Sequence, residues 1–256
     1  MLYNMVDRVF IGHMQPAETV GKLALTGVGV CLPIIMVISA FASLMAIGGA
    51  PRASIAEGAG ESEKSERIMG NCLTMLLVTA LVLTVLFEAF AEPLLLLFGA
   101  SENTIGYALD YMRIYALGTV FVQLTLGMNA YITAQGFART GMLSVMIGAG
   151  CNIVLDPVLI YGFGMGVRGA ATATVISQAV STVWVLSFLT GKKTVLKIRK
   201  KYLRMEAGVV LPGLALGLAP FIMQASESVI TVCFNASLLK YGGDVAVGAM
   251  TILSSA

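Results

Sequence analysis

Long apolar runs dominate this sequence and exclude an ordinary water-soluble fold. A helix needs about 20 mostly apolar residues to cross roughly 30 Å of bilayer hydrocarbon, because each residue adds about 1.5 Å. Five runs clearly meet this length, and a later one meets it although prolines interrupt it. The runs cover about 27–50, 68–91, 110–134, 141–163, 169–190 and 209–240. The sequence therefore predicts an all-α fold, a polytopic bundle of transmembrane helices.

Composition supports lipid as the main solvent of this chain. Only 12% of the residues are charged, whereas soluble domains carry about 25%. The net charge of +2 gives no basic footprint for nucleic acid. The cysteines lie far apart, inside or beside apolar runs, and form no CxxC pair; they are Cys31, Cys72, Cys151 and Cys233. We expect small core residues there, no metal or disulfide framework, and the bilayer as the partner.

The two ends of the chain are too short to span a membrane. As a helix, residues 1–13 would cover only about 18 Å, and residues 245–256 are equally short. We therefore expect a truncated sequence whose first and last helices are incomplete. The N-terminus has neither a basic segment nor a small-residue cleavage site, so no cleavable signal peptide is expected.

Basic residues concentrate in three loops, at 51–67, 135–140 and 191–206. The positive-inside rule predicts that these loops are cytoplasmic in a multi-pass protein of the plasma (inner) membrane. The run KKTVLKIRKKYLR at 192–204 is typical of a loop that contacts anionic lipid headgroups.

The longest of these loops also suggests a domain boundary. We predict an N-terminal lobe at 1–190, a basic inter-lobe loop at 191–206 and the start of a second lobe at 207–256. A short turn, YGGD at 241–244, precedes VAVGAMTI, much as a short turn precedes LALTGVGV near the N-terminus. Internal repeats of this kind are typical of transporters, and they imply a missing C-terminal lobe as a partner.

Acidic residues inside apolar runs are the best functional candidates, because each costs about 2.5–3.5 kcal/mol to insert centrally. Asp7, Asp156 and Glu227 qualify. Asn152 lies four residues before Asp156, so both project from one helix face, and Pro157 predicts a kink there. Desolvation favours a neutral carboxyl group, which suits reversible binding of a proton or a small cation. For Asp156, a buried acid paired with a structural arginine or amide is the alternative; for Asp7, beside Arg8 in a short helix, an interfacial residue is the alternative.

Further polar residues follow the same helical spacing. Thr174 and Gln178 share a face of the next run, where ordinary interhelical hydrogen bonding would also explain them. Gln224, Glu227 and Asn235 form a polar line in the last long run, and for Glu227 both a functional and a structural pairing remain open.

Other features have simpler explanations. Tyr107, Tyr111 and Tyr115 share a helix face near the predicted outer surface, where an aromatic belt is expected. His13 is the only histidine and lies by a helix end, so a metal site is not expected on it. Neither HExxH nor a GxSxG-type elbow occurs, so we predict no enzyme, no catalytic residues and no cofactor.

Three stretches of the chain carry a family resemblance: NMVDRVFIG (4–12), AQGFARTG (134–141) and, most specifically, NIVLDPVLIYGFGMGVRGAA (152–171). They resemble the MATE family of multidrug antiporters. The resemblance implies twelve spans in two six-helix lobes, and export of cationic or amphipathic compounds in exchange for H⁺ or Na⁺. This chain would contain the first lobe, with its first helix truncated, and one to two helices of the second.

The resemblance also assigns roles to individual residues. Asp7 matches the first-helix aspartate of a cation site, Asn152 and Asp156 match its fifth-helix residues, and Thr174 its sixth-helix threonine. Na⁺ or H⁺ would bind among these four. Glu227 matches more loosely a seventh-helix glutamate of one branch, and Arg8, beside Asp7, departs from the family pattern.

Two other functions remain as alternatives. A lipid-linked oligosaccharide flippase of the same superfamily should line its cavity with basic residues, whereas the apolar runs here offer mainly acids. A membrane fragment without transport activity is the other alternative.

Overall fold

The computed structural model describes residues 2–14 and 20–253, with side chains from residue 7 onward, and over this part of the chain it is helical without strands. In chain order the elements are α1 (Leu2–Gly12), α2 (Lys22–Val30), α3 (Leu32–Gly58), α4 (Ser62–Ala89), α5 (Ala91–Leu97), α6 (Ile105–Leu117), α7 (Thr119–Ala134), α8 (Ala138–Pro157), the π-turn η2 (Val158–Gly162), α9 (Val167–Thr190), the 3₁₀ turn η3 (Lys200–Tyr202) and α10 (Ala207–Leu253).

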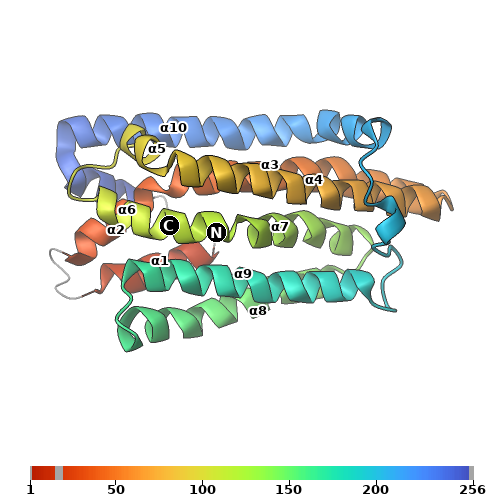
Figure 1. Ribbon diagram of the computed structural model, residues 1–256, viewed down its shortest axis with the longest axis horizontal. Helices are drawn as coiled ribbons and strands as arrows, with labels where there is room; N and C mark the ends of the chain where they lie inside the picture. The colour runs from red at the N-terminus through yellow and green to blue at the C-terminus, as the bar shows by residue number, and fades with distance from the viewer. Residues whose placement is uncertain (1, 15–19, 254–256) are drawn as a thin grey trace.

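The helices lie side by side along the long axis of the molecule (Figure 1). α8 and α9 form one edge, α10 follows the opposite edge, and α3, α4 and α7 lie between them. Five helical segments are long and apolar enough to cross a membrane: Lys22–Gly58, Ser62–Ala89, Ala138–Gly162, Val167–Thr190 and Ala207–Leu253. Large apolar side chains such as Leu81 and Val85 face outward, as lipid contact requires. The predicted multi-pass helical bundle is confirmed.

The predicted single span over 110–134 was wrong in one respect, because two consecutive helices, α6 and α7, share this run. Gly118 separates them, and its backbone N–H bonds to the carbonyl of Tyr115 at 3.0 Å. A Cβ atom at Gly118 would lie 2.4 Å from the side chain of Val175 on α9. Close packing against α9 therefore requires glycine at this break, which hydropathy alone does not reveal.

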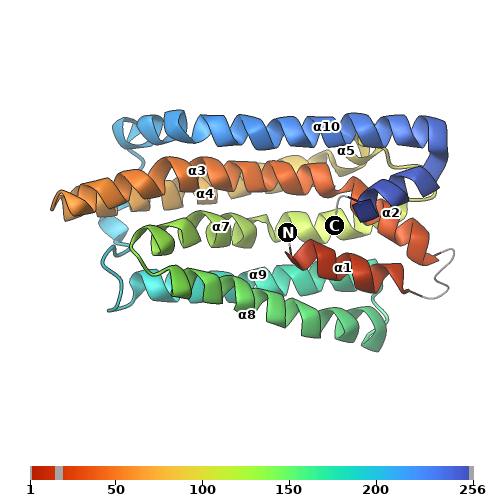
Figure 2. The same cartoon turned by 180° about the vertical axis from the view of Figure 1, so that it is seen from behind.

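α10 also contains a break. Gly243 has a φ of +63°, which is favourable only for glycine, and it lies in the predicted YGGD turn. Beyond it, the last segment of α10 turns back beside α2 (Figure 2).

The three basic loops meet at one end of the bundle. The side-chain oxygen of Gln135 accepts hydrogen bonds at 2.9 Å from the backbone N–H groups of Val195 and Leu196. Arg199 pairs with Glu66 at 2.6 Å. The structure thus places the predicted basic segments at 51–67, 135–140 and 191–206 at the same end of the bundle.

Glycine brings α3 and α10 into backbone contact. A Cβ atom at Gly48 would lie 2.0 Å from the carbonyl oxygen of Gly213, and one at Gly217 would lie 2.0 Å from that of Leu44. Small residues allow such close approach between membrane helices, where van der Waals contact replaces the hydrophobic effect as the driving force.

Substituting Gly217 with alanine is therefore expected to separate α3 from α10. Overpacking of this kind costs about 1–3 kcal/mol, which should lower the thermal unfolding temperature in detergent. Gly208→Ala, in the same helix, is the matched control, because its Cβ atom would meet nothing within 4 Å. Equal unfolding temperatures for the two variants would contradict the close contact.

Candidate functional site

A buried carboxylate, Asp7 on α1, lies at the junction of four helices. Its side chain is fully buried. The hydroxyl of Tyr111 on α6 donates to Oδ2 at 2.8 Å, and Nδ2 of Asn152 on α8 donates to Oδ1 at 3.2 Å. The hydroxyl of Thr174 on α9 lies 2.8 Å from Oδ2 and 3.0 Å from Oδ1. Segments far apart in the sequence therefore supply the donors to this one group.

Asn152 joins Asp7 to a second buried carboxyl group. Its Nδ2 atom lies 3.1 Å from Oδ1 of Asp156 and 3.3 Å from Oγ1 of Thr174. Asp156 is itself fully buried. An amide nitrogen carries two hydrogens, yet three acceptor atoms surround this one, so it cannot satisfy all of them at once. Asp7, Asn152, Asp156 and Thr174 form one connected network, named here the acidic cluster.

The acidic cluster contains more acceptors than donors. Oδ1 of Asn152 and Oδ2 of Asp156 are buried and have no hydrogen-bond partner among the described residues. Buried polar atoms are normally bonded, so such exceptions need an explanation. Carboxylate and amide oxygens are the ligands that hard cations prefer, and a carboxylate also accepts a proton. The residues therefore fit a proton or a small cation.

An irregular turn follows directly after the two residues that α8 contributes to the acidic cluster, Asn152 and Asp156. Pro157 ends the α-helix, and the chain continues through the π-turn η2; π-turns occur frequently at functional sites. Gly169 at the start of α9 packs against this turn, and a Cβ atom there would lie 2.8 Å from the backbone of Leu159. This contact brings α9, and with it Thr174, close to Asp156.

A second polar contact holds α8 and α9 together further along. The hydroxyl of Ser181 donates to the carbonyl of Ser144 at 2.8 Å. Both side chains are fully buried. The two helices are therefore fixed on both sides of the residues that lie between, including Asn152 and Thr174.

The remaining predicted residues lie outside the acidic cluster's hydrogen bonds. Gln178 is buried one turn beyond Thr174, and its Oε1 atom has no partner among the described residues. Asn235 on α10 is buried against Gly99, Gln224 is half-buried, and Glu227 is exposed on α10. The structure thus does not bring Glu227 together with Asp7, and the roles of these α10 residues stay predictions.

Tyr111 was missed as a site residue. The expected aromatic belt is wrong for Tyr111 and Tyr115, because both are buried and stack on each other with ring centroids 5.9 Å apart. Only Tyr111 donates to Asp7. The available signal was a hydroxyl within an apolar run, but the sequence gives no indication of a partner 104 residues away.

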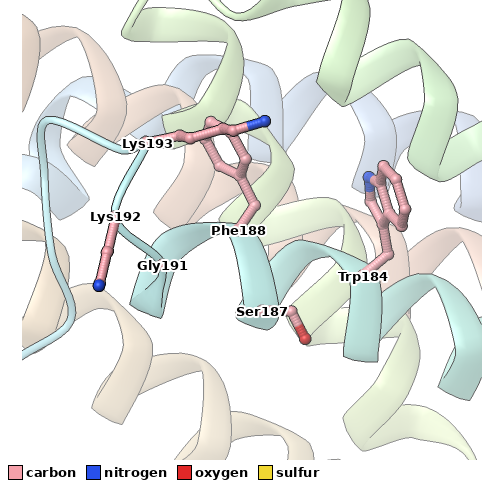
Figure 3. Close-up of a pocket in the computed structure, with 6 residues that line it drawn as sticks. All are labelled: Trp184, Ser187, Phe188, Gly191, Lys192 and Lys193. Carbon is pink, nitrogen blue, oxygen red and sulfur yellow. The ribbon is translucent and has the colours of Figure 1, made fainter.

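A surface hollow of about 380 Å³ lies elsewhere on α9 and the loop after it. Figure 3 shows its lining residues, which are Trp184, Ser187, Phe188, Gly191, Lys192 and Lys193. None of them belongs to the acidic cluster, so this hollow is separate from the candidate site.

The fold and the acidic cluster together define a class, namely multi-pass helical membrane proteins with an ionisable site inside the bundle. Comparison with known proteins identifies one family within this class. The MatE family model matches residues 1–158. The multidrug export protein MepA of Staphylococcus haemolyticus is 28% identical over 94% of this chain and 52% of its own length.

Solved structures agree with this match. The MATE multidrug transporter DinF-BH is 35% identical with a TM-score of 0.91, over 99% of this chain and 56% of that one. An inward-facing MATE transporter of the MOP superfamily is 26% identical with a TM-score of 0.90, over 98% and 56% of the two chains. The chain belongs to the MATE family, and it spans about half the length of the curated relatives it matches.

Removing one hydroxyl tests the environment of Asp7. Tyr111→Phe leaves the ring in place but deletes a donor to a buried carboxylate, which should cost about 1–3 kcal/mol. Tyr115→Phe is the matched control, since Tyr115 is buried one turn away without a hydrogen bond to Asp7. The difference is measured by thermal unfolding in detergent. Equal losses in the two variants would contradict the described bond.

Proposed function

We propose that the complete protein is a secondary active multidrug efflux antiporter, which exports small cationic or amphipathic compounds in exchange for H⁺ or Na⁺. The observation that carries this proposal is the pair of buried carboxyl groups, Asp7 and Asp156, joined through Asn152 with acceptor oxygens left over. Acidic groups deep inside a membrane bundle are costly and mark ion pathways.

Cation binding would change the bonds that hold α1. With Asp7 ionised, Tyr111, Asn152 and Thr174 all direct donors toward it. A proton or Na⁺ arriving from the outer side binds between Asp7 and Asp156 and neutralises one negative charge of the pair, which weakens the charge-assisted bonds to Asp7. α1 is then free to shift, and the altered bundle releases the exported compound. The ion gradient drives the cycle, at about 2.3 kcal/mol per charge per 100 mV.

The names of the relatives support this proposal. Several are named multidrug export proteins, and one solved relative is described as a MATE multidrug transporter. Because this chain spans about half of their length, transport belongs to the complete protein with its second half. We also propose that the complete protein lies in the plasma membrane with its three basic loops in the cytoplasm, because basic loops of membrane proteins usually face the cytoplasm.

Replacing one carboxyl group of the acidic cluster tests the proposed coupling. At the full length of the relatives, Asp156→Asn is expected to reduce ion-driven efflux by at least about tenfold, because a neutral amide cannot take up and release a cation. The measurement follows a fluorescent cation in vesicles under an imposed pH gradient and, separately, a Na⁺ gradient. The gradient that drives efflux identifies the coupling ion.

Asp110→Asn is the matched control, since Asp110 is part-exposed and pairs with Arg168 at the surface. It should retain efflux close to that of the parent protein. The 256-residue chain alone, reconstituted in the same vesicles, should give no flux. Full efflux by Asp156→Asn under the gradient that drives the parent protein would show that the assignment is wrong.

A further inference from the structure

Arg8, which follows Asp7 on α1, is a buried arginine with a bond to a distant part of the chain. It is only 7% exposed, and its Nη1 atom donates to the backbone carbonyl of Thr251 at 2.9 Å. Thr251 lies in the last segment of α10, 243 residues along the chain. Arg8 therefore links the first helix of the chain to the last.

The position of Arg8 beside Asp7 gives α1 two different contact faces. Consecutive residues of an α-helix point about 100° apart. Asp7 is directed toward α6, α8 and α9, whereas Arg8 is directed toward α10. A movement of α1 that follows from a change at Asp7 must therefore also act on the bond to Thr251.

The segment that Arg8 holds is packed tightly against α2. After Gly243, α10 turns back and runs beside α2, toward α1 (Figure 2). A Cβ atom at Gly29 would lie 1.9 Å from Oγ1 of Thr251, and one at Gly248 would lie 2.7 Å from Oγ1 of Thr26. Val247, the residue before Gly248 on α10, is also fully buried. This contact joins the predicted N-terminal lobe to the start of the predicted second lobe.

We propose that Arg8 is a positioning residue for transport, which couples the occupancy of the acidic cluster to the contact between α2 and the last segment of α10. The proposal rests on the proposed antiporter function. When a cation neutralises Asp7 and α1 shifts, Arg8 changes its bond to Thr251, and the face between the two lobes loosens.

The chemistry of this bond suits a coupling element. The acceptor is a backbone carbonyl, so the bond reports the position of the α10 backbone and not the identity of a side chain. The guanidinium stays charged at any physiological pH, so the donor does not titrate. Hydrogen bonds from charged donors are stronger than neutral ones. The bond therefore responds to movement of α1 relative to the α10 backbone, and not to pH.

The test measures how readily the contact opens. The protein is made at the full length of its relatives, with the native cysteines replaced. In it, Val247→Cys places a thiol in the contact between α10 and α2. A membrane-impermeant thiol reagent is applied to each face of the vesicle in turn. Arg8→Met should raise the labelling rate from one face roughly tenfold or more, the size expected for losing one bond from a charged donor. Arg8→Lys, which keeps a charged donor, should restore most of the slow labelling.

Arg168→Met is the matched control, because Arg168 is exposed and pairs with Asp110 at 2.8 Å. It should leave the labelling rate unchanged. If Arg8→Met does not accumulate in the membrane, Arg8→Gln replaces it, and it should also label faster than Arg8→Lys. An unchanged rate in the accumulated neutral variant would overturn the proposal.

A double variant separates coupling from simple support of the fold. Asp7→Asn alone should also change the labelling rate, and its effect should not add to that of Arg8→Met, since both act through α1. Additive effects would overturn the coupling. Labelling requires no transport. Failure of the Arg8 proposal is therefore distinguishable from failure of the antiporter function, which the efflux of Asp156→Asn tests separately.

Discussion

A carboxylate buried inside a membrane bundle must be surrounded by donors, and the rest of this structure follows from that constraint. Asp7 is fully buried, and its donors come from three separate helices, α6, α8 and α9. Because solvent does not reach this side chain to replace a missing donor, the helices must be held in register around it. The ionisable site is thus also a structural junction of the N-terminal part of the bundle.

Close backbone contacts keep this junction in place. Glycine at 118, 169 and 217 allows neighbouring helices to approach more closely than any side chain would permit. The π-turn after Pro157 then brings α9 next to Asp156. α1 is bonded to α8 and α9 through Asp7 and to the last segment of α10 through Arg8. A short helix with two such contacts can pass a local change of charge to a distant part of the bundle.

The sequence predicted the parts of this arrangement that depend on local spacing. Apolar length gave the bundle, because helices satisfy their own backbone groups in lipid. The spacing of Asn152 and Asp156 placed both on one face, and the family resemblance assigned Asp7 and Thr174 to the same site. Long-range partners were not accessible: periodicity could not separate Tyr111, which donates to Asp7, from an interfacial tyrosine. Likewise, nothing local showed that α6 and α7 break at a glycine pressed against α9.

The central claim is that the carboxyl groups of the acidic cluster take up a cation within the bundle. Modification by the apolar reagent dicyclohexylcarbodiimide tests this directly, since it reacts with protonated carboxyl groups in apolar surroundings. Mass spectrometry of the treated protein should find the label on Asp7 or Asp156, decreasing as pH rises or as Na⁺ is added, while the surface residue Asp110 stays unlabelled. Absence of label on both residues, or labelling that responds to neither H⁺ nor Na⁺, would contradict the account.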